Sequence, residues 1–155
     1  MGRWGAQLVG ASSLLVLIGC GSQGDEGVGG VDTSGFHGLW AAQHSTGTDT
    51  CFGDFDSSAI QLTVRIRPGK TTALEYVALD QQNLTRETCV QNFDVAASEA
   101  TMTEEHSCFY GVQEVRYTDD HLTVSGDSLE ETGSSETTGS EGVCKSTFHV
   151  SFTRL

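Results

Sequence analysis

Basic residues are scarce in this sequence. The chain has 8 Lys and Arg residues against 21 Asp and Glu residues, a formal net charge of −13, and every acidic residue follows Gly24. Nucleic acids and anionic lipid surfaces are bound through clusters of Lys and Arg, so this charge balance argues against both as partners. The acidic surplus is accounted for by solubility, and attraction to a cationic partner is the alternative.

Proline and helical patterns are also nearly absent. Pro68 is the only proline, and no long run of apolar residues recurs at the helical spacing of 3.6 residues, so amphipathic helices are not expected. Apolar and polar residues alternate instead, which is typical of half-buried strands. The clearest alternation is in residues 60–67, with Ile60, Leu62, Val64 and Ile66 on one face, and in residues 147–153, with Phe148, Val150 and Phe152 on one face.

Known catalytic and metal-binding patterns are missing as well. The chain has no GxSxG motif, no phosphate-binding loop and no HExxH or HxH pattern, which are the local signatures of several hydrolase, nucleotide and metal sites. It also lacks a CxxC pair and any Cys/His spacing typical of zinc sites. We therefore predict no enzymatic activity, no cofactor and no metal.

The first 19 residues have the pattern of an export signal. Arg3 is followed by an almost wholly apolar stretch, Leu8–Ile18, which is too short to span a membrane. The stretch ends in Leu17-Ile18-Gly19-Cys20, which resembles the lipobox of bacterial lipoproteins. The resemblance implies that residues 1–19 are cleaved, that Cys20 carries a membrane-anchoring lipid, and that Gly21 favours the outer membrane. An ordinary secretory signal is the alternative.

The remaining chain divides into a linker and one domain. Residues 20–36 are rich in Gly, Ser and Asp without apolar periodicity, which is typical of a flexible tether. Residues 37–155 are long enough for one modest core. This part contains four cysteines, and four cysteines in a small exported domain predict two disulfides, for which three connectivities are possible.

The domain is predicted to be all-β with eight strands. Short links between successive strands favour an antiparallel meander, and eight such strands close most simply into an up-and-down barrel. A small two-sheet β-sandwich is the alternative. Two segments, Ser45–Ser58 and Ser128–Val143, are expected to be loops at one rim. The six weaker strand candidates are His37–His44, Thr72–Leu79, Arg86–Ala96, Ala100–Cys108, Val112–Thr118 and His121–Gly126.

The predicted topology places all four cysteines near one rim. Cys89 and Cys108 lie at similar distances on either side of the turn around Ser98-Glu99. In a closed barrel the last strand pairs with the first, which brings Cys144 near Cys51. We therefore predict the pairs Cys89–Cys108 and Cys51–Cys144.

Gly38-Leu39-Trp40, in the first predicted strand, resembles the Gly-x-Trp motif of lipocalins and the wider calycin superfamily. The resemblance implies a lipocalin-like barrel in which Trp40 closes the floor and Arg154, from the last strand, packs across the indole face. Thr118-Asp119-Asp120, in a predicted turn, is a weaker match to the Thr-Asp-aromatic motif that lipocalins often carry there.

The resemblance also implies a function. Lipocalin-like barrels usually bind a small apolar or amphipathic molecule in the open end, and a barrel filled completely by side chains is the alternative. A second hypothesis is a protein-binding role, such as an envelope hydrolase inhibitor or an assembly partner, with the acidic rim loops as the contact surface. The predicted pocket lining is Leu62, Val64, Tyr76, Met102 and Phe148.

Two expectations concern polar residues. If Cys89 and Cys108 point inward, period-two alternation also turns Gln91, Phe93, Glu104 and His106 inward, whereas a hairpin end that flares into solvent would expose them. Adjacent acidic pairs, Glu104-Glu105 and Glu130-Glu131, are interpreted as solvent-facing.

Overall fold

The computed structural model describes residues 31–58, 60–139 and 142–155. Within these ranges the regular structure is entirely β, and no helix is long and apolar enough to cross a membrane. The lipobox around Cys20 and most of the predicted linker lie outside the described residues. The strands are β1 (Gly38–Asp49), β2 (Gly53–Ser57), β3 (Thr63–Pro68), β4 (Leu74–Asp80), β5 (Asn83–Ala96), β6 (Glu99–Met102), β7 (His106–Tyr110), β8 (Gln113–Ser125), β9 (Ser128–Gly139) and β10 (Gly142–Arg154).

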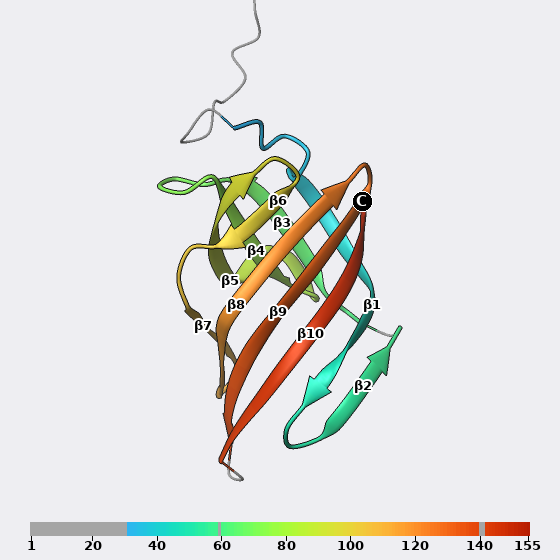
Figure 1. Ribbon diagram of the computed structural model, residues 1–155, viewed down its shortest axis with the longest axis vertical. Coiled ribbons are helices and arrows are strands. Elements are labelled where there is room, and N and C mark those ends of the chain that lie inside the picture. Colours follow the sequence, from blue (N-terminus) through green and yellow to red (C-terminus); the bar gives the residue numbers. More distant parts are fainter. Residues whose placement is uncertain (1–30, 59, 140–141) are drawn as a thin grey trace, which may run out of the picture.

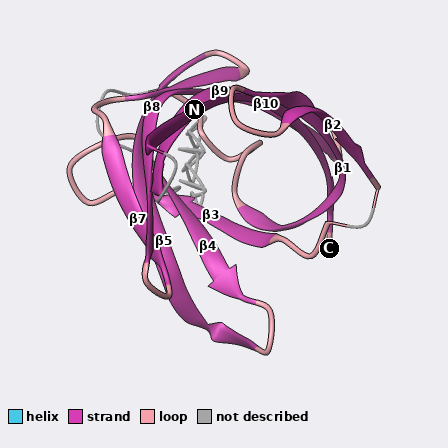
Figure 2. Ribbon diagram, turned by 90° about the horizontal axis from the view of Figure 1, so that it is seen from below, coloured by secondary structure: helices cyan, strands magenta, loops and turns pink. Residues whose placement is uncertain are grey.

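The sheet closes on itself into a barrel (Figures 1 and 2). The hydrogen-bonded order is β10-β9-β8-β6-β5-β4-β3-β1, and β1 pairs with β10 to complete the ring. The closing ladder is antiparallel and runs from the pair Trp40–Arg154 to the pair Asp49–Ser146. β2 and β7 are additional strands, paired with β1 and β8 respectively. The predicted eight-stranded antiparallel barrel is confirmed, and the sandwich alternative is wrong.

The acidic, low-complexity segment Ser128–Val143 is not a loop, which corrects one prediction. Its described residues, 128–139 and 142–143, form β9 and the start of β10, and β9 is hydrogen-bonded to β8 on one side and to β10 on the other. Backbone hydrogen bonds to strands on both sides stabilise this segment, and these bonds do not depend on which side chains it carries. The alternation was hard to recognise because the inward positions after Leu129 are Glu131, Gly133 and Ser135 rather than large apolar residues.

A second correction concerns residues 112–126. The two strands predicted there are one strand, β8, with an irregularity between Tyr117 and Asp119. A β-bulge inserts an extra residue into one strand without ending it. The segment Thr118-Asp119-Asp120 therefore lies within a strand, and its proposed match to a lipocalin turn does not hold.

Two further segments differ from the predicted pattern. Ser45–Ser58, predicted as a loop, is the second half of β1 followed by the short hairpin strand β2. The predicted strand Ala100–Cys108 is broken into β6 and β7, which pair with different parts of β8. Glu104 lies in the break and is exposed, whereas Gln91 and Phe93 on β5 are almost completely buried.

The core fills one end of the barrel. Its largest fully buried side chains include Trp40, Phe36, Phe93 and Phe152. Phe36 belongs to the predicted linker, residues 20–36, but it is only 1% exposed, so the packed domain begins before residue 37. The backbone carbonyl of Phe36 accepts a hydrogen bond from Trp40 Nε1 at 2.9 Å, which ties this segment to β1.

Two disulfides join elements that are distant in the sequence. Cys51, after β1, is bonded to Cys144 on β10 with 5.5 Å between their Cα atoms. Cys89 on β5 is bonded to Cys108 on β7 with 5.4 Å between their Cα atoms. Both predicted pairs are therefore present.

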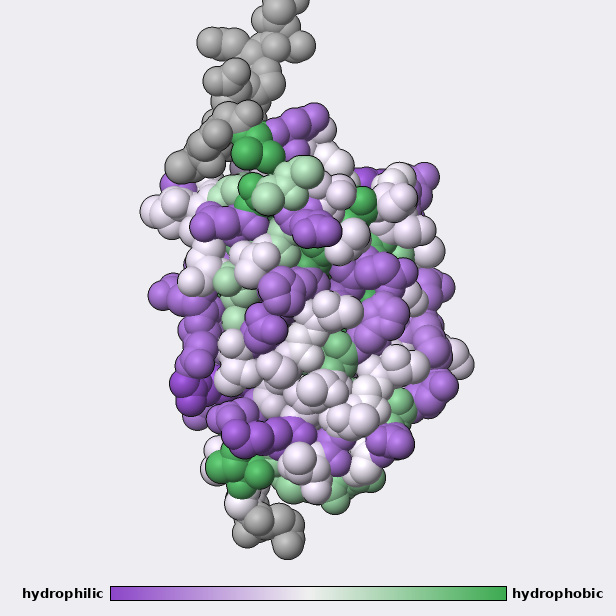
Figure 3. Space-filling model, in the orientation of Figure 1, coloured by the Kyte–Doolittle hydropathy of each residue, from purple (hydrophilic) through white to green (hydrophobic). Residues whose placement is uncertain are grey.

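The outer surface is largely hydrophilic, with apolar side chains gathered towards the two ends in the view of Figure 3. The ends of β1, β7 and β9 and the starts of β2, β8 and β10 meet at one end, which we call the mouth. The start of β1 and the end of β10 lie at the opposite end, the floor. Large apolar side chains exposed at the mouth are Phe52, Phe109, Val112 and Val143.

Candidate functional site

The floor is closed by Trp40 and Arg154. These residues are register partners across the β1–β10 ladder, and the Arg154 guanidinium carbon lies 4.1 Å from the centroid of the Trp40 ring. This is a cation–π contact. Arg154 Nη2 also donates to the Gly35 carbonyl at 2.7 Å, and Nη1 donates to the carbonyl of His37. The predicted floor is therefore present. An added Cβ at Gly38 would lie 3.0 Å from Arg154 Nη1, so the glycine leaves room for the guanidinium.

On the mouth side of the packed core the barrel is hollow. The cavity has a volume of about 200 Å³ and lies between the core and the mouth. An apolar cavity of about 150 Å³ is large enough for benzene, so this space suits a molecule with one ring and a short chain. Its lining residues are Ser45, Ile60, Leu62, Tyr76, Ala78, Cys89, Gln91, Tyr110, Tyr117, Glu131, Ser135, Phe148 and Val150.

The predicted pocket residues divide into two groups. Leu62, Tyr76 and Phe148 line the cavity. Val64 is completely buried within the core, and Met102 packs against that core from a partly buried position. The last two do not line the cavity, because they lie nearer the floor, where side chains fill the barrel.

A layer of polar side chains separates the cavity from the core. Tyr76 donates a hydrogen bond from its hydroxyl to Glu131 Oε2 at 2.8 Å. Asp120, on the neighbouring strand, is 0% exposed, and among the described residues no basic side chain donates a hydrogen bond to either of its oxygens. Gln91 is 1% exposed, and its Oε1 lacks a donor. Glu131 is 4% exposed, so its interpretation as solvent-facing is wrong.

Burial changes the acidity of this layer. Removal from water, together with the neighbouring Glu131, raises the pKa of Asp120 to about 10. Burial also raises the pKa of Glu131, although hydrogen bonds from Tyr76 and Asp120 oppose the change. Two adjacent carboxyl groups in a dry interior resist ionising together. A proton held between them at neutral pH allows one carboxyl to donate to the other.

Aromatic residues surround the part of the cavity that is nearest the mouth. The hydroxyls of Tyr110 and Tyr117 lie 3.3 Å apart, and Tyr117 meets Phe148 edge to face with 6.1 Å between ring centroids. Burial raises the pKa of both tyrosines, so both remain neutral at physiological pH. Because their rings are apolar and their hydroxyls are polar, the cavity wall near the mouth offers both kinds of surface.

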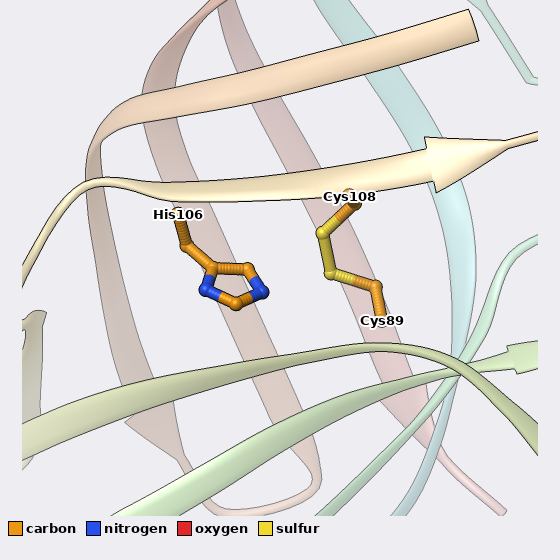
Figure 4. Close-up of side chains that lie close together, drawn as sticks. All are labelled: Cys89, His106 and Cys108. Carbon is orange, nitrogen blue, oxygen red and sulfur yellow. A yellow bond between two sulfur atoms is a disulfide. The ribbon is translucent and has the colours of Figure 1, made fainter.

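One wall depends on the Cys89–Cys108 disulfide. β5 and β7 do not pair through a backbone ladder, and the disulfide links them there. Figure 4 shows Cys108 and His106 pointing from the same strand toward the strand that carries Cys89. The two sulfurs and a His106 ring nitrogen lie within 4.8 Å of one another. Because the sulfurs are bonded to each other, they do not offer the thiolates that zinc requires.

Sequence reasoning missed the acidic pair. Glu131 was hidden in a segment interpreted as a loop, and Asp120 in a segment interpreted as a turn. The signal available was the period-two position of Glu131 relative to Leu129, which becomes informative once residues 128–139 are recognised as a strand.

Comparison with known proteins does not assign this chain to a family. No model of a protein family matches the chain, and no curated protein matches it. Among solved structures, the fold is similar to that of a protein of unknown function from the DUF3598 family of Nostoc punctiforme, with a TM-score of 0.41 and 9% sequence identity. The similarity covers 81% of this chain and 49% of that chain, so the chain spans about half the length of that structure.

Proposed function

We propose that this protein is a lipid-anchored lipoprotein of the cell envelope that binds a small apolar or amphipathic molecule inside its barrel. The observation that supports ligand binding is the cavity of about 200 Å³ between the core and the mouth. Apolar side chains, among them Ile60, Leu62 and Phe148, would cover the body of the ligand. The binding energy would come from removing this apolar surface from water.

The position of the described N-terminal residues is compatible with anchoring. Phe36 packs at the floor, so the chain joins the barrel at the end opposite the mouth. A lipid on Cys20 would therefore tether the protein by its closed end. The mouth, with its tyrosines and exposed apolar rim, would remain free for ligand entry.

Ligand binding can be tested with a neutral amphipathic probe, 2-phenylethanol. In methyl NMR spectra of the full-length protein in detergent, we expect shifts at Ile60 and Leu62 and none at Leu122, which is fully buried in the core. Ser135→Leu should fill the cavity and abolish these shifts. Thr132→Leu, on the exposed face of the same strand, is the matched control. Absence of shifts in the unaltered protein would contradict the proposal.

Anchoring is tested separately, by labelling producing cells with palmitate. We expect label on the protein and its recovery in the membrane fraction, with loss of both in Cys20→Ser. An unlabelled protein, or membrane recovery that survives Cys20→Ser, would contradict the lipid anchor without affecting the ligand proposal.

A second candidate function is protein binding, as an envelope hydrolase inhibitor or an assembly partner. The acidic segment that was predicted to form the contact surface is a strand, and its Glu130 and Glu136 pair with His149 and Lys145. The exposed apolar rim is the feature that favours this candidate. Phe52 is 87% exposed, and Val112 is fully exposed. If the rim binds a partner, chemical cross-linking in the cell envelope should join the unaltered protein to that partner. The double variant Phe52→Ser, Val112→Ser should lose the cross-linked complex and still bind 2-phenylethanol.

A further inference from the structure

In the part of the chain that the structure describes, the buried side-chain polar atoms without a hydrogen-bond partner are all oxygens. Among the described residues they are Gln91 Oε1 and both carboxyl oxygens of Asp120. Buried polar groups in folded proteins are nearly always hydrogen-bonded, so each exception requires an explanation. The proton that Asp120 and Glu131 hold between them accounts for the carboxyl pair, which leaves Gln91 Oε1 as the atom that still needs a donor. Gln91 and Glu131 line the cavity, whereas Asp120 does not.

The cavity is lined by an acidic side chain and, within the described part of the chain, by no basic one. Glu131 and Tyr76 are its titratable groups at the polar layer, and Tyr110 and Tyr117 lie nearer the mouth. No Lys, Arg or His of residues 31–58, 60–139 or 142–155 lines it. The Tyr76 hydroxyl, in the cavity wall, donates a hydrogen bond to Glu131. Several carboxylates on the outer surface are paired with bases, as Glu136 is with Lys145 at 2.9 Å. The interior acids differ from these surface acids because no basic side chain accompanies them.

We propose that the ligand is a small organic amine, bound with its ammonium group between Glu131 and Gln91 and its apolar body toward the mouth. This inference rests on the proposed ligand-binding function and specifies its chemistry. An ammonium offers several N–H donors to the carboxylate and to the free amide oxygen. The rings of Tyr117 and Phe148 provide apolar surface on the mouth side of the ammonium group, and aromatic faces also attract cations.

An inorganic cation fits these surroundings less well. Calcium and magnesium take six or more oxygen ligands, and magnesium retains several waters. The cavity instead combines one carboxylate, one amide oxygen and tyrosine hydroxyls with aliphatic and aromatic walls. Such walls favour a cation that carries its own apolar surface.

Three probes of nearly equal shape test the proposal on the full-length protein by calorimetry at pH 7. They are 2-phenylethylamine, which is cationic, 2-phenylethanol, which is neutral, and 3-phenylpropionate, which is anionic. We expect the amine to bind at least about tenfold more tightly than the alcohol, and the anion to bind more weakly than both. Equal affinities for amine and alcohol would overturn the proposal. If no probe binds, the proposed ligand-binding function itself fails.

Variants locate the charge preference. Glu131→Gln should reduce the affinity for the amine by at least about tenfold and leave that for the alcohol within about twofold. Glu130→Gln, on the exposed face of the same strand, should change neither. Retention of amine preference in Glu131→Gln would overturn the proposed contact. Should that variant fail to fold, the probe series on the unaltered protein still decides. Calcium or magnesium that displaces the amine competitively would also overturn it.

Discussion

Trp40 and Arg154 face each other across the ladder that closes the barrel, with the guanidinium carbon 4.1 Å from the centroid of the indole ring. The same guanidinium donates to the carbonyls of Gly35 and His37. One side chain therefore joins the last strand, the first strand and the segment that precedes it. Its position explains how the floor stays closed although the two strands come from opposite ends of the domain.

Removing this guanidinium should loosen the floor. Arg154→Ala deletes the cation–π contact and leaves two carbonyls without their donor, so we expect a loss of about 2 kcal/mol in the free energy of unfolding. Urea denaturation followed by tryptophan fluorescence measures it. Arg86→Ala is the control, because the Arg86 side chain is 71% exposed and its nearest carboxylate is 3.5 Å away. Equal losses in the two variants would contradict the role of Arg154.

The two disulfides should contribute unequally to stability. Cys51 and Cys144 are separated by 93 residues, whereas Cys89 and Cys108 are separated by 19. In the chain-entropy account a longer closed loop restricts the unfolded chain more, about 4.7 kcal/mol for 100 residues against about 3 for 15. We expect the double variant Cys51→Ala, Cys144→Ala to lose more stability than Cys89→Ala, Cys108→Ala in urea denaturation. The reverse order would show that contacts in the folded wall dominate.

Stability should fall as the pH rises through neutrality. The raised pKa of Asp120, about 10, means that the folded protein holds a proton that the unfolded chain releases near pH 4. The folded state binds more protons between these values, so the free energy of unfolding decreases with rising pH, by at most about 1.4 kcal/mol per unit for one group. The raised pKa of Glu131 acts in the same direction.

Asp120→Asn should remove most of this pH dependence. The difference between the unfolding free energies of the variant and the unaltered protein, measured at each pH, should shift in favour of the variant by at least about 2 kcal/mol from pH 5 to pH 9. Asp54→Asn, in the exposed strand β2, serves as the control. Parallel pH profiles for Asp120→Asn and the unaltered protein would contradict a buried proton at this site.

Gly133 should not tolerate a side chain. A Cβ added there would lie 2.5 Å from the Asp119 carbonyl oxygen and 2.7 Å from Phe148 Cζ. We expect Gly133→Ala to cost about 1–3 kcal/mol through overcrowding and to weaken 2-phenylethanol binding, because Phe148 lines the cavity. On the same strand, an added Cβ at Gly139 would meet no atom within 4 Å. Gly139→Ala should therefore change stability by less than about 0.5 kcal/mol.

Local alternation predicted much of the fold and little of the cavity. Residues 60–67 and 147–153 carry large apolar residues on one face, and both contribute barrel strands. β9 was missed because its inward face carries a glutamate, a glycine and a serine where a packed core would have apolar residues. The strand count was nevertheless right, because joining two predicted strands into β8 compensated for the missing β9. The polar interior of the cavity is thus the reason why its strands were hard to recognise.

The sequence by itself predicted an all-β barrel, because apolar residues alternate with period two, and it favoured the two cysteine pairs from the expected order of the strands. The resemblance of Gly38-Leu39-Trp40 to a lipocalin motif implied the residues of the floor. Only the tertiary structure decided that Asp120, Glu131 and Gln91 lie together in the interior. The physical reason is that these residues come from different strands, brought together by the curvature of the sheet and the bulge in β8. A carboxylate in a strand has the same local sequence signal whether it faces the outer solvent or the inside of the barrel.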